Sequence, residues 1–430
     1  MLEKQAQKGY NRPMWQRSKN LYHLFVAFCA TIINRFPAKK LTVIGVTGTD
    51  GKTTTTNIIY HLLKESGKQV SMISTIGAVI NGTEYDTGFH VTTPSPFAVQ
   101  KFLRRAVEKI GHSQERQYMV LEVTSHAIDQ NRIFGIHFDI VVLTNITHEH
   151  LDYHKTYENY VQTKAKLLHK AKIAIVNKDD GSFQLISNIP ASAGSSVSRD
   201  KFPISNFKLV TYGMGKDSEV NLQNFPFKTK LFGEFNKYNC LAAIAVCRQL
   251  GISDEQIRKA LLSFRLPIGR AEIIHEDDFI VMVDFAHTPN AIVQLLSSVK
   301  PAVKGKLIHV FGSAGERDHK KRPEMGRVSA EYADIIILTA EDPRSESVQQ
   351  ITQEIESGIK NKELRTKEKT LLEIPDRREA IKTALKMASK GDFIAVTGKG
   401  HERSLNLGKG EIPWSDQEVI REILGKNHNE

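Results

Sequence analysis

Short hydrophobic runs alternate with longer amphipathic stretches along most of the chain. The run Leu41–Val46 is followed by a glycine-containing turn and then by apolar residues at helical spacing from Ile58 to Leu63. A continuous apolar run that ends in a turn is typical of a strand buried in a parallel sheet. Four more buried strands are predicted in the same half of the chain: Val70–Ser74, Met119–Val123, Ile140–Thr144 and Ile173–Val176.

The alternation stops near Leu266–Gly269 and then begins again. Before this break lie a predicted loop, Ile189–Asp200, and two predicted helices, Phe235–Leu250 and Glu255–Phe264. Alternating strands and helices predict an α/β fold with parallel sheets that are covered by helices on both faces. After the break, the predicted strands are Phe279–Val283, Lys306–Phe311, Ile335–Thr339 and Phe393–Val396.

We expect three parts: a basic N-terminal segment of residues 1–40, a first α/β domain of residues 41–265 and a second of residues 266–430. The N-terminal segment holds one apolar stretch, Leu21–Ile33, with helical spacing. It is too short to cross a bilayer, which needs about 20 apolar residues. Two interpretations stay open: an amphipathic helix packed on the next domain, and a helix lying weakly on a membrane surface, helped by nearby Lys and Arg.

The composition is that of an ordinary soluble protein, with 40% hydrophobic and 25% charged residues in 430. The net charge of +11 comes from scattered basic residues without an aromatic stripe, so no nucleic acid is expected as a partner. Cys29, Cys240 and Cys247 lie in apolar surroundings without metal-ligand spacing. They indicate a reducing compartment, and no signal peptide is apparent, so we expect a cytoplasmic protein, which we take to be a monomer.

The turn after the first strand has the features of a nucleotide phosphate-binding loop. Thr47–Gly51 joins a strand to a helix that begins with Lys52 and Thr53. Backbone N–H groups at such a turn point at an anion, and the helix dipole adds to the attraction. Lys52 would reach the terminal phosphates and the Thr53 hydroxyl would face Mg2+. Val46 stands where the common motif has its first glycine, and a plain strand–turn–helix is the alternative.

Three other strand ends in the first domain are also predicted to carry clusters of polar residues. Glu122 is placed where a carboxylate could bind Mg2+ next to Thr53, and Thr92-Thr93 forms a short hydroxyl-rich loop. Thr144–His154 contains three histidines and two carboxylates. That cluster is consistent with a Mg2+ site beside a nucleotide, with a zinc site or with a solvated polar loop.

Several motifs together resemble one family, the Mur ligases. They are Thr47–Thr54 (TGTDGKTT), Glu122–His126, Thr144–His154 and Asp284–Pro289 (DFAHTP). Mur ligases are ATP-dependent enzymes that build the peptide stem of bacterial peptidoglycan precursors, and the resemblance is nearest to the type that adds the third amino acid. It implies a central P-loop ATPase domain with a parallel sheet and a C-terminal Rossmann-like domain that binds the incoming amino acid.

The resemblance assigns ATP and Mg2+ to named residues. Glu122 and His150 would be metal ligands together with Thr53. Lys164 would carry a carbamate (N6-carboxylysine), which turns a cation into an anionic oxygen ligand suited to Mg2+; the plain alternative is a helix-surface lysine. The implied ATP-binding residues are Gly48, Thr49, Asp50, Gly51, Lys52, Thr53, Thr54, Asn236, Asn239, Arg270, Asp284 and His287. Phe285 replaces a common tyrosine and Asn290 a common aspartate.

The resemblance also implies contacts to the two joined substrates. The muramoyl-peptide precursor would be held by Thr92, Thr93, Ser125 and Arg132. The incoming amino acid would be held by Arg317, Asp342, Arg344, Gly398 and Glu402. An arginine at 344 can pair with a distal carboxylate in a fork geometry, which favours meso-diaminopimelate over L-lysine. Asp342 stands where diaminopimelate-using members have asparagine.

The expected activity is therefore the ATP-dependent addition of a diamino acid to a muramoyl-L-Ala-D-Glu precursor through an acyl phosphate. Family members carry an N-terminal domain that binds the UDP of the precursor, whereas only about 40 residues precede the phosphate-loop strand here. Two alternatives stay open, a folylpolyglutamate-type ligase and a non-catalytic ATP-binding regulatory protein. Asp342–Arg344 and Gly398–Glu402 argue against the first, and the intact set of Lys52, Glu122, His150 and Lys164 argues against the second.

Overall fold

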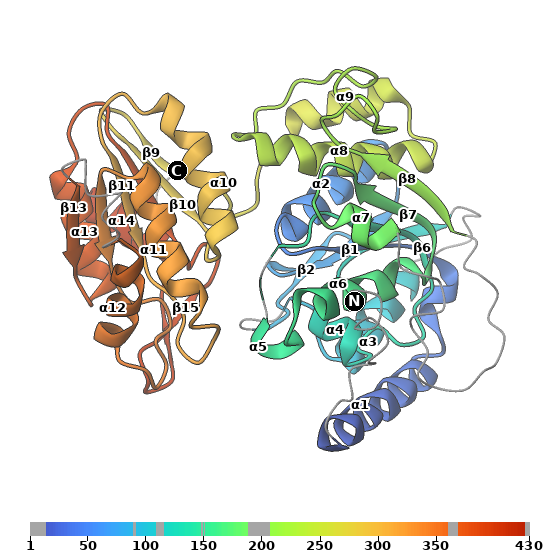
Figure 1. The fold of residues 1–430 in the computed structure, drawn as a ribbon. Helices are drawn as coiled ribbons and strands as arrows, with labels where there is room; N and C mark the ends of the chain where they lie inside the picture. Colours follow the sequence, from blue (N-terminus) through green and yellow to red (C-terminus); the bar gives the residue numbers. More distant parts are fainter. Residues whose placement is uncertain are drawn as a thin grey trace, which may run out of the picture.

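The computed structural model describes residues 14–88, 92–108, 116–147, 149, 151–187, 207–359 and 369–425. These residues form an eight-stranded sheet, a six-stranded sheet and a short two-stranded ribbon. The two large sheets belong to two lobes that face each other in Figure 1. The α/β fold class is thereby confirmed, and the two sheets fall within the predicted ranges 41–265 and 266–430, whose bounds stay a prediction.

The first sheet has the order β4-β3-β2-β5-β1-β6-β7-β8. The phosphate-loop strand, β1, lies between β5 and β6, with which it pairs in parallel. The antiparallel edge strands are β3 (Gly77–Ile80) and β4 (Thr83–Tyr85). The parallel strands are β1 (Leu41–Thr47), β2 (Val70–Ser74), β5 (Gln117–Glu122), β6 (Phe138–Leu143), β7 (Ala171–Asn177) and β8 (Lys208–Tyr212).

Helices cover both faces of this sheet because β1 and its neighbours are apolar on both sides. Ile44 and Val46 face one core, with α2 (Lys52–Glu65), α8 (Glu234–Gln249) and α9 (Asp254–Ser263). The opposite core contains α3 (Pro96–Glu108), α4 (Ser125–Asp129) and α6 (Tyr157–Leu168). The short elements η1 (Pro37–Lys40), α5 (Leu151–His154) and α7 (Phe183–Ser187) complete the lobe.

The second sheet has the order β13-β12-β11-β14-β10-β9, with only β9 antiparallel. Its strands are β9 (Glu272–Glu276), β10 (Ile280–Asp284), β11 (Leu307–Phe311), β12 (Ile335–Leu338), β13 (Thr370–Glu373) and β14 (Phe393–Thr397). The remaining elements are α10 (Pro289–Val299), η2 (Lys300–Ala302), α11 (Lys321–Tyr332), α12 (Val348–Ile359), α13 (Arg377–Met387), β15 (Ser404–Asn406), β16 (Glu411–Pro413) and α14 (Asp416–Ile423). All nine predicted strands of the two sheets are confirmed, whereas the predicted loop Ile189–Asp200 lies outside the described residues.

The N-terminal helix α1 (Met14–Ile33) contacts the first lobe with its small residues. Ala27, Ala30 and Thr31 are buried, and the Thr31 hydroxyl donates to the Phe134 carbonyl oxygen at 3.1 Å. The predicted packing on the lobe is thus confirmed, and the Phe28 ring adds an edge contact to the Phe134 ring at 6.1 Å between centroids. The large apolar residues of α1 nevertheless stay largely exposed, with Leu21 at 68% and five others: Tyr22, Phe25, Phe28, Ile32 and Ile33. Within the described ranges, no helix is both long and apolar enough to cross a bilayer.

Candidate active site

The phosphate loop between β1 and α2 is too crowded for any residue but glycine at two positions. Gly48 and Gly51 have φ angles of 149° and 78°. A Cβ atom at Gly51 would lie 2.4 Å from Asn239 Oδ1, and one at Gly48 would lie 1.8 Å from Thr144 Oγ1. The close approach of the loop backbone to its neighbours therefore requires glycine at both positions, as in glycine-containing phosphate loops.

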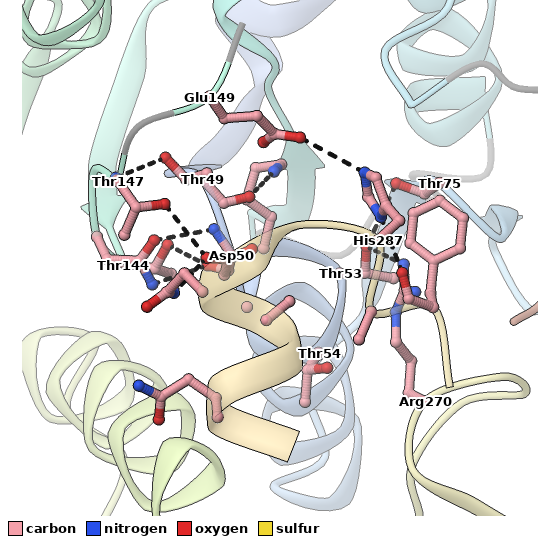
Figure 2. Close-up of a pocket in the computed structure, with 18 of the residues that line it drawn as sticks. Thr49, Asp50, Thr53, Thr54, Thr75, Thr144, Thr147, Glu149, Arg270 and His287 are labelled. Carbon is pink, nitrogen blue, oxygen red and sulfur yellow. Dashed lines mark hydrogen bonds and ion pairs between the residues drawn. The ribbon is translucent and has the colours of Figure 1, made fainter. Parts of the chain in front are cut away.

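The residues that follow β6 hold this loop in place (Figure 2). The Thr49 and Asp50 amides donate to the Asn145 backbone and side-chain oxygens, each at 2.9 Å. The Thr144 hydroxyl donates to the Asp50 carbonyl oxygen at 2.6 Å, and the Thr147 amide donates to Thr49 Oγ1 at 3.0 Å. The start of the predicted polar cluster Thr144–His154 therefore supports the loop backbone, a role that its composition did not indicate.

Two lysines approach carbonyl oxygens of the same loop. Lys52 Nζ donates to the Thr49 carbonyl and Lys164 Nζ to the Gly48 carbonyl, both at 2.6 Å. Lys164 is 1% exposed, and its ammonium lies over the Tyr160 ring at 4.5 Å from the centroid. Burial, followed by repulsion from Lys52, holds the pKa of Lys164 well below its usual value. The interpretation of Lys164 as a helix-surface lysine is wrong.

Glu122 is oriented by two threonines at the carboxyl end of β5. Its Oε1 accepts from the Thr53 hydroxyl at 3.0 Å and from the Thr75 hydroxyl at 2.8 Å. Its Oε2 accepts from the Thr75 amide at 2.9 Å, and the side chain is 1% exposed. The sequence did not single out Thr75. It directly follows β2, the neighbour of β5, so the rule that ligand-binding groups gather at strand ends could have found it.

The donors at this point fit Mg2+. Thr53 and Glu122 offer a hydroxyl and a carboxylate, the hard oxygen ligands that Mg2+ takes together with nucleotide phosphates. Among the described residues, no three His, Cys, Asp or Glu side chains gather into a metal cage. His150 lies outside the described residues, so its metal role stays a prediction, as does the zinc alternative. His154 is buried with Nε2 3.0 Å from Ser125 Oγ.

The start of α8 places two predicted asparagines beside the loop. Asn239 Nδ2 donates to Asn236 Oδ1 at 3.1 Å, and Asn239 Oδ1 accepts from the Thr55 hydroxyl at 3.2 Å. Tyr238, which was not predicted, donates its hydroxyl to Asp179 Oδ2 at 3.1 Å. All these residues except Thr55 line the same cavity as the phosphate loop.

The second lobe reaches the phosphate loop through three polar contacts (Figure 2). Arg270 Nη2 donates to Thr53 Oγ1 at 3.2 Å, and the guanidinium lies over the Phe285 ring at 4.5 Å. Asn290 Nδ2 donates to Asp50 Oδ2 at 2.7 Å. His287 Nε2 lies 3.5 Å from Glu149 Oε1. Phe285, which stands where the family commonly has tyrosine, still provides an aromatic ring against which the Arg270 guanidinium packs.

Electrostatics at this junction follow from burial. Burial and the Glu149 carboxylate raise the pKa of Asp50, and the Asn290 hydrogen bond only partly opposes them. Burial would lower the pKa of His287, but the Glu149 carboxylate outweighs it and raises that pKa. Asp284 accepts from the Ala271 and Ala286 amides at 2.6 and 2.7 Å, so it shapes the backbone that carries Arg270 and His287.

Three of the four predicted acceptor residues line the cavity. Thr92 Oγ1 accepts from the Thr75 hydroxyl at 3.2 Å, and the Thr93 hydroxyl donates to the Glu122 carbonyl at 3.0 Å. Arg132 Nη1 donates to the Thr93 carbonyl at 2.8 Å. Ser125 is buried against His154 outside the lining, as are Gly48 and Lys164 behind the loop.

The far end of the cavity carries the residues predicted for the amino acid. The Asp342 carboxylate faces buried Lys399, with both oxygens 2.8 Å from Nζ, and Glu402 Oε2 is 2.6 Å from the same Nζ. Lys399 thus places one positive charge between the Asp342 and Glu402 carboxylates, so the three side chains together keep a net negative charge. Arg344 Nη1 donates to the Gly315 carbonyl at 2.8 Å, and exposed Arg317 lies at the rim.

One cavity of about 730 Å3 joins the parts of the site that face open space. Residues of both lobes line it, from the phosphate loop and Glu122 to Arg317 and Arg344. A strand–loop–helix phosphate cradle that faces a second α/β lobe across a shared cavity defines a class of protein, the two-lobed P-loop nucleotide-binding proteins.

Comparison with known proteins narrows the class. A family model for the Mur ligase middle domain matches residues 46–247, and one for the Mur ligase glutamate ligase domain matches residues 269–400. A relative from Aquifex aeolicus, a UDP-N-acetylmuramoyl-L-alanyl-D-glutamate–2,6-diaminopimelate ligase, is 39% identical over 90% of this chain and 78% of its own length. The chain belongs to the Mur ligase family, as the sequence motifs predicted.

Solved structures agree with this assignment. A structure with the same ligase name is 28% identical, with a TM-score of 0.57, over 91% of this chain and 79% of its own. A bifunctional folylpolyglutamate synthase/dihydrofolate synthase from Yersinia pestis has a TM-score of 0.65 over 87% of this chain and 90% of its own. The latter is only 19% identical, so it shares the fold and carries no argument about the substrate.

Proposed function

We propose that this protein is an ATP-dependent ligase that joins a diamino acid to a muramoyl-L-Ala-D-Glu precursor in peptidoglycan synthesis. The single observation that carries the proposal is the shared cavity, which has the phosphate loop and Glu122 at one end and Arg317 and Arg344 at the other. A cavity shared by the two lobes could bring the reacting ends of a nucleotide and two organic substrates together. The ligase names of the relatives support the same reaction.

In the proposed reaction, the terminal carboxylate of the acceptor attacks the γ-phosphate of ATP and gives an acyl phosphate and ADP. The amine of the incoming amino acid then attacks the acyl carbon and releases phosphate. The backbone amides at the start of α2 and the Lys52 ammonium would hold the transferred phosphoryl group, while Arg270 adds a positive charge from the second lobe. Mg2+ bound with ATP at Thr53 and Glu122 would neutralise charge on the phosphates. Alignment of the substrates supplies much of the rate.

We also propose that Lys164 carries a carbamate in the working enzyme. Its ammonium is buried, and within the described part of the chain no carboxylate pairs with it, which is a costly state for a lysine. Reaction of the neutral amine with CO2 would replace the buried cation by an anion that could accept hydrogen bonds or help to hold Mg2+. The nearby Gly48 carbonyl shows that the amine already lies against the phosphate loop.

The incoming amino acid that we favour is meso-diaminopimelate. Arg317 and Arg344 line the end of the cavity opposite the phosphate loop, where a second carboxylate of this substrate could bind in a fork geometry. L-Lysine has no such carboxylate. The pairing of Asp342 with buried Lys399 partly offsets the negative charge that aspartate brings to this part of the cavity.

The first prediction is the substrate dependence of phosphate release. We expect release from ATP only when a muramoyl-L-Ala-D-Glu acceptor and a diamino acid are both present, with meso-diaminopimelate preferred over L-lysine. The measurement uses acceptors and amino acids singly and in pairs. Release that depends on a folate and glutamate would favour the folylpolyglutamate-type reaction. ATP binding without acceptor-dependent phosphate release would contradict the proposal that the protein is a ligase and would favour a regulatory protein.

A weak contact of α1 with an anionic membrane surface is a further part of the proposal. The helix has no acidic residue, and its exposed apolar residues lie near exposed Lys19, Arg35, Lys39 and Lys40. Large apolar side chains beside basic ones are typical of helices that lie in a lipid interface. The opposite face of α1 is already packed on the lobe, so the helix can present the exposed face without unfolding anything.

The second prediction tests this contact by sedimentation with lipid vesicles. The protein should bind vesicles that contain phosphatidylglycerol, bind pure phosphatidylcholine weakly, and lose affinity as salt is added. Changing Leu21 and Phe25 to glutamine should weaken binding at least about tenfold, because both would insert into the interface. Leu262→Gln, at another exposed leucine, is the control. Unchanged binding by the double variant, or a dimer that this variant disrupts, would contradict the proposal.

A further inference from the structure

The end of β12 carries a buried carboxylate that no part of the account above uses. Glu341 lies in the cavity lining and is 6% exposed. Among the described residues, its buried Oε2 atom has no hydrogen-bond partner. An unpaired carboxylate in the interior costs free energy, so its presence in a cavity points to a ligand that completes it.

The backbone around Glu341 is built to admit this side chain. Gly398 follows β14 and has a φ of 101°, and a Cβ atom there would lie 2.5 Å from Glu341 Oε2. Gly312 follows β11, and a Cβ atom there would lie 2.2 Å from the Thr339 carbonyl and 3.1 Å from Glu341 Cβ. The ends of β11, which pairs with β12, and of β14, the next strand beyond β11, therefore both carry glycine where a larger residue would crowd the glutamate or its backbone. This is the carboxyl end of the parallel strands, where ligands bind in such sheets.

The neighbouring carboxylates have protein partners, in contrast to Glu341. Asp342 pairs with Lys399 and accepts from the Asn406 amide at 2.9 Å, and Glu402 pairs with the same lysine. These groups are held by the fold. Glu341 therefore offers the incoming amino acid an acceptor that the protein itself does not occupy.

The surroundings of Glu341 bring the pKa of its carboxyl group close to neutral pH. Burial raises the pKa of Glu341 to about 7, against the opposing effect of the cations of His287, Lys321, Arg377 and Lys399. A base with a pKa near the working pH can take up a proton and release it again in each turnover.

Building on the ligase reaction proposed above, we propose that Glu341 is the general base that deprotonates the attacking ammonium of the incoming amino acid. One proton passes from the ammonium nitrogen to the Glu341 carboxylate, which leaves a neutral amine. The nitrogen lone pair forms the C–N bond to the acyl carbon, and the C–O bond to phosphate breaks with its electron pair. The second proton leaves the nitrogen with the phosphate, so the products are an amide and hydrogen phosphate.

The third prediction separates this role from simple binding of the substrate ammonium. Glu341→Gln keeps the size of the side chain but cannot take up the proton. We expect kcat for amide formation to fall roughly 100-fold, with the KM for the amino acid within a few-fold of wild type. Glu331→Gln, at an exposed glutamate on α11, is the matched control and should leave both values unchanged. A raised KM with unchanged kcat would make Glu341 a binding contact and overturn the proposal.

Hydroxylamine distinguishes this proposal from the ligase reaction on which it rests. Its nitrogen is already neutral near neutral pH, so it can trap an acyl phosphate as a hydroxamate without a base. Glu341→Gln should therefore form hydroxamate at the wild-type rate, which also shows that the variant is folded. Loss of both hydroxamate and amide would overturn the role of base. Absence of ATP-dependent hydroxamate from the wild type would overturn the ligase reaction itself, and this proposal with it.

The pH profile gives a second readout. Glu341 acts as a base only when deprotonated, so wild-type kcat should rise as pH increases through about 7. Glu341→Asp keeps a carboxylate one methylene shorter and should retain that rise at a lower rate. Glu341→Gln should lack it. A rise that persists unchanged in the glutamine variant would contradict the assignment.

Discussion

Replacing Lys52 with alanine should lower the rate of amide formation by about 100- to 1,000-fold while the protein stays folded. Removal of one preorganised donor from a developing anion typically costs this much. Lys52 opens α2, lines the cavity and lies 2.6 Å from the Thr49 carbonyl, so its ammonium is already held at the phosphate cradle. Hydroxamate formation should slow to the same extent as amide formation, because Lys52 acts in the phosphoryl transfer that precedes both.

The measurement is ATP- and acceptor-dependent phosphate release, with thermal unfolding as the check on folding. Lys52 is half-buried and makes one side-chain hydrogen bond to the backbone, so its truncation should change stability only slightly. Lys64→Ala, at an exposed lysine near the other end of α2, is the control and should keep full activity. Activity within a few-fold of wild type in Lys52→Ala would show that the loop does not carry the reaction.

Replacing Lys164 with methionine should also cost about 100-fold or more in kcat, if the carbamate provides one of the charged groups at the phosphoryl-transfer site. Methionine is close to lysine in volume, and it removes a buried cation without leaving a cavity. Because the ammonium is buried without a paired carboxylate among the described residues, its removal should leave stability unchanged or higher.

Dependence on bicarbonate identifies the carbamate. Wild-type activity should fall in buffers depleted of CO2 and return when bicarbonate is added, whereas the residual activity of Lys164→Met should not respond. Lys172→Met removes an exposed lysine that is paired only with Asp139, and it should behave as wild type. A mass increase of one carbamate on gentle ionisation of the wild type would support the assignment. Full activity in Lys164→Met would refute it.

The strands of both sheets were predictable to the extent that they are buried on both faces. A parallel strand covered by helices reads as a continuous apolar run, which is why β1, β2, β11 and β14 were found within a few residues. The strands that the sequence did not reveal lie at sheet edges or are half-exposed, so polar residues interrupt their pattern. They are β3, β4, β8, β9 and β13.

The candidate site was predictable where a motif fixes the backbone and less so where packing decides. Lys52, Thr53 and Glu122 meet because their strands are neighbours and their motifs end those strands. The burial of Lys164 could not be read from the sequence, because it depends on how α6 lies against the loop. Thr75 belongs to no motif, and Glu341 stands at the start of the motif Glu341–Arg344 without having been given a role, although both residues directly or closely follow strands of a parallel sheet.

The amide of Asn290 and the carboxylate of Asp50 form a matched pair across the two lobes. Aspartate at position 290 would bring two like charges to the same short separation, and their repulsion would push the lobes apart. The identities of residues 50 and 290 are therefore interdependent. Any redesign that places aspartate at 290 therefore needs a neutral partner at 50.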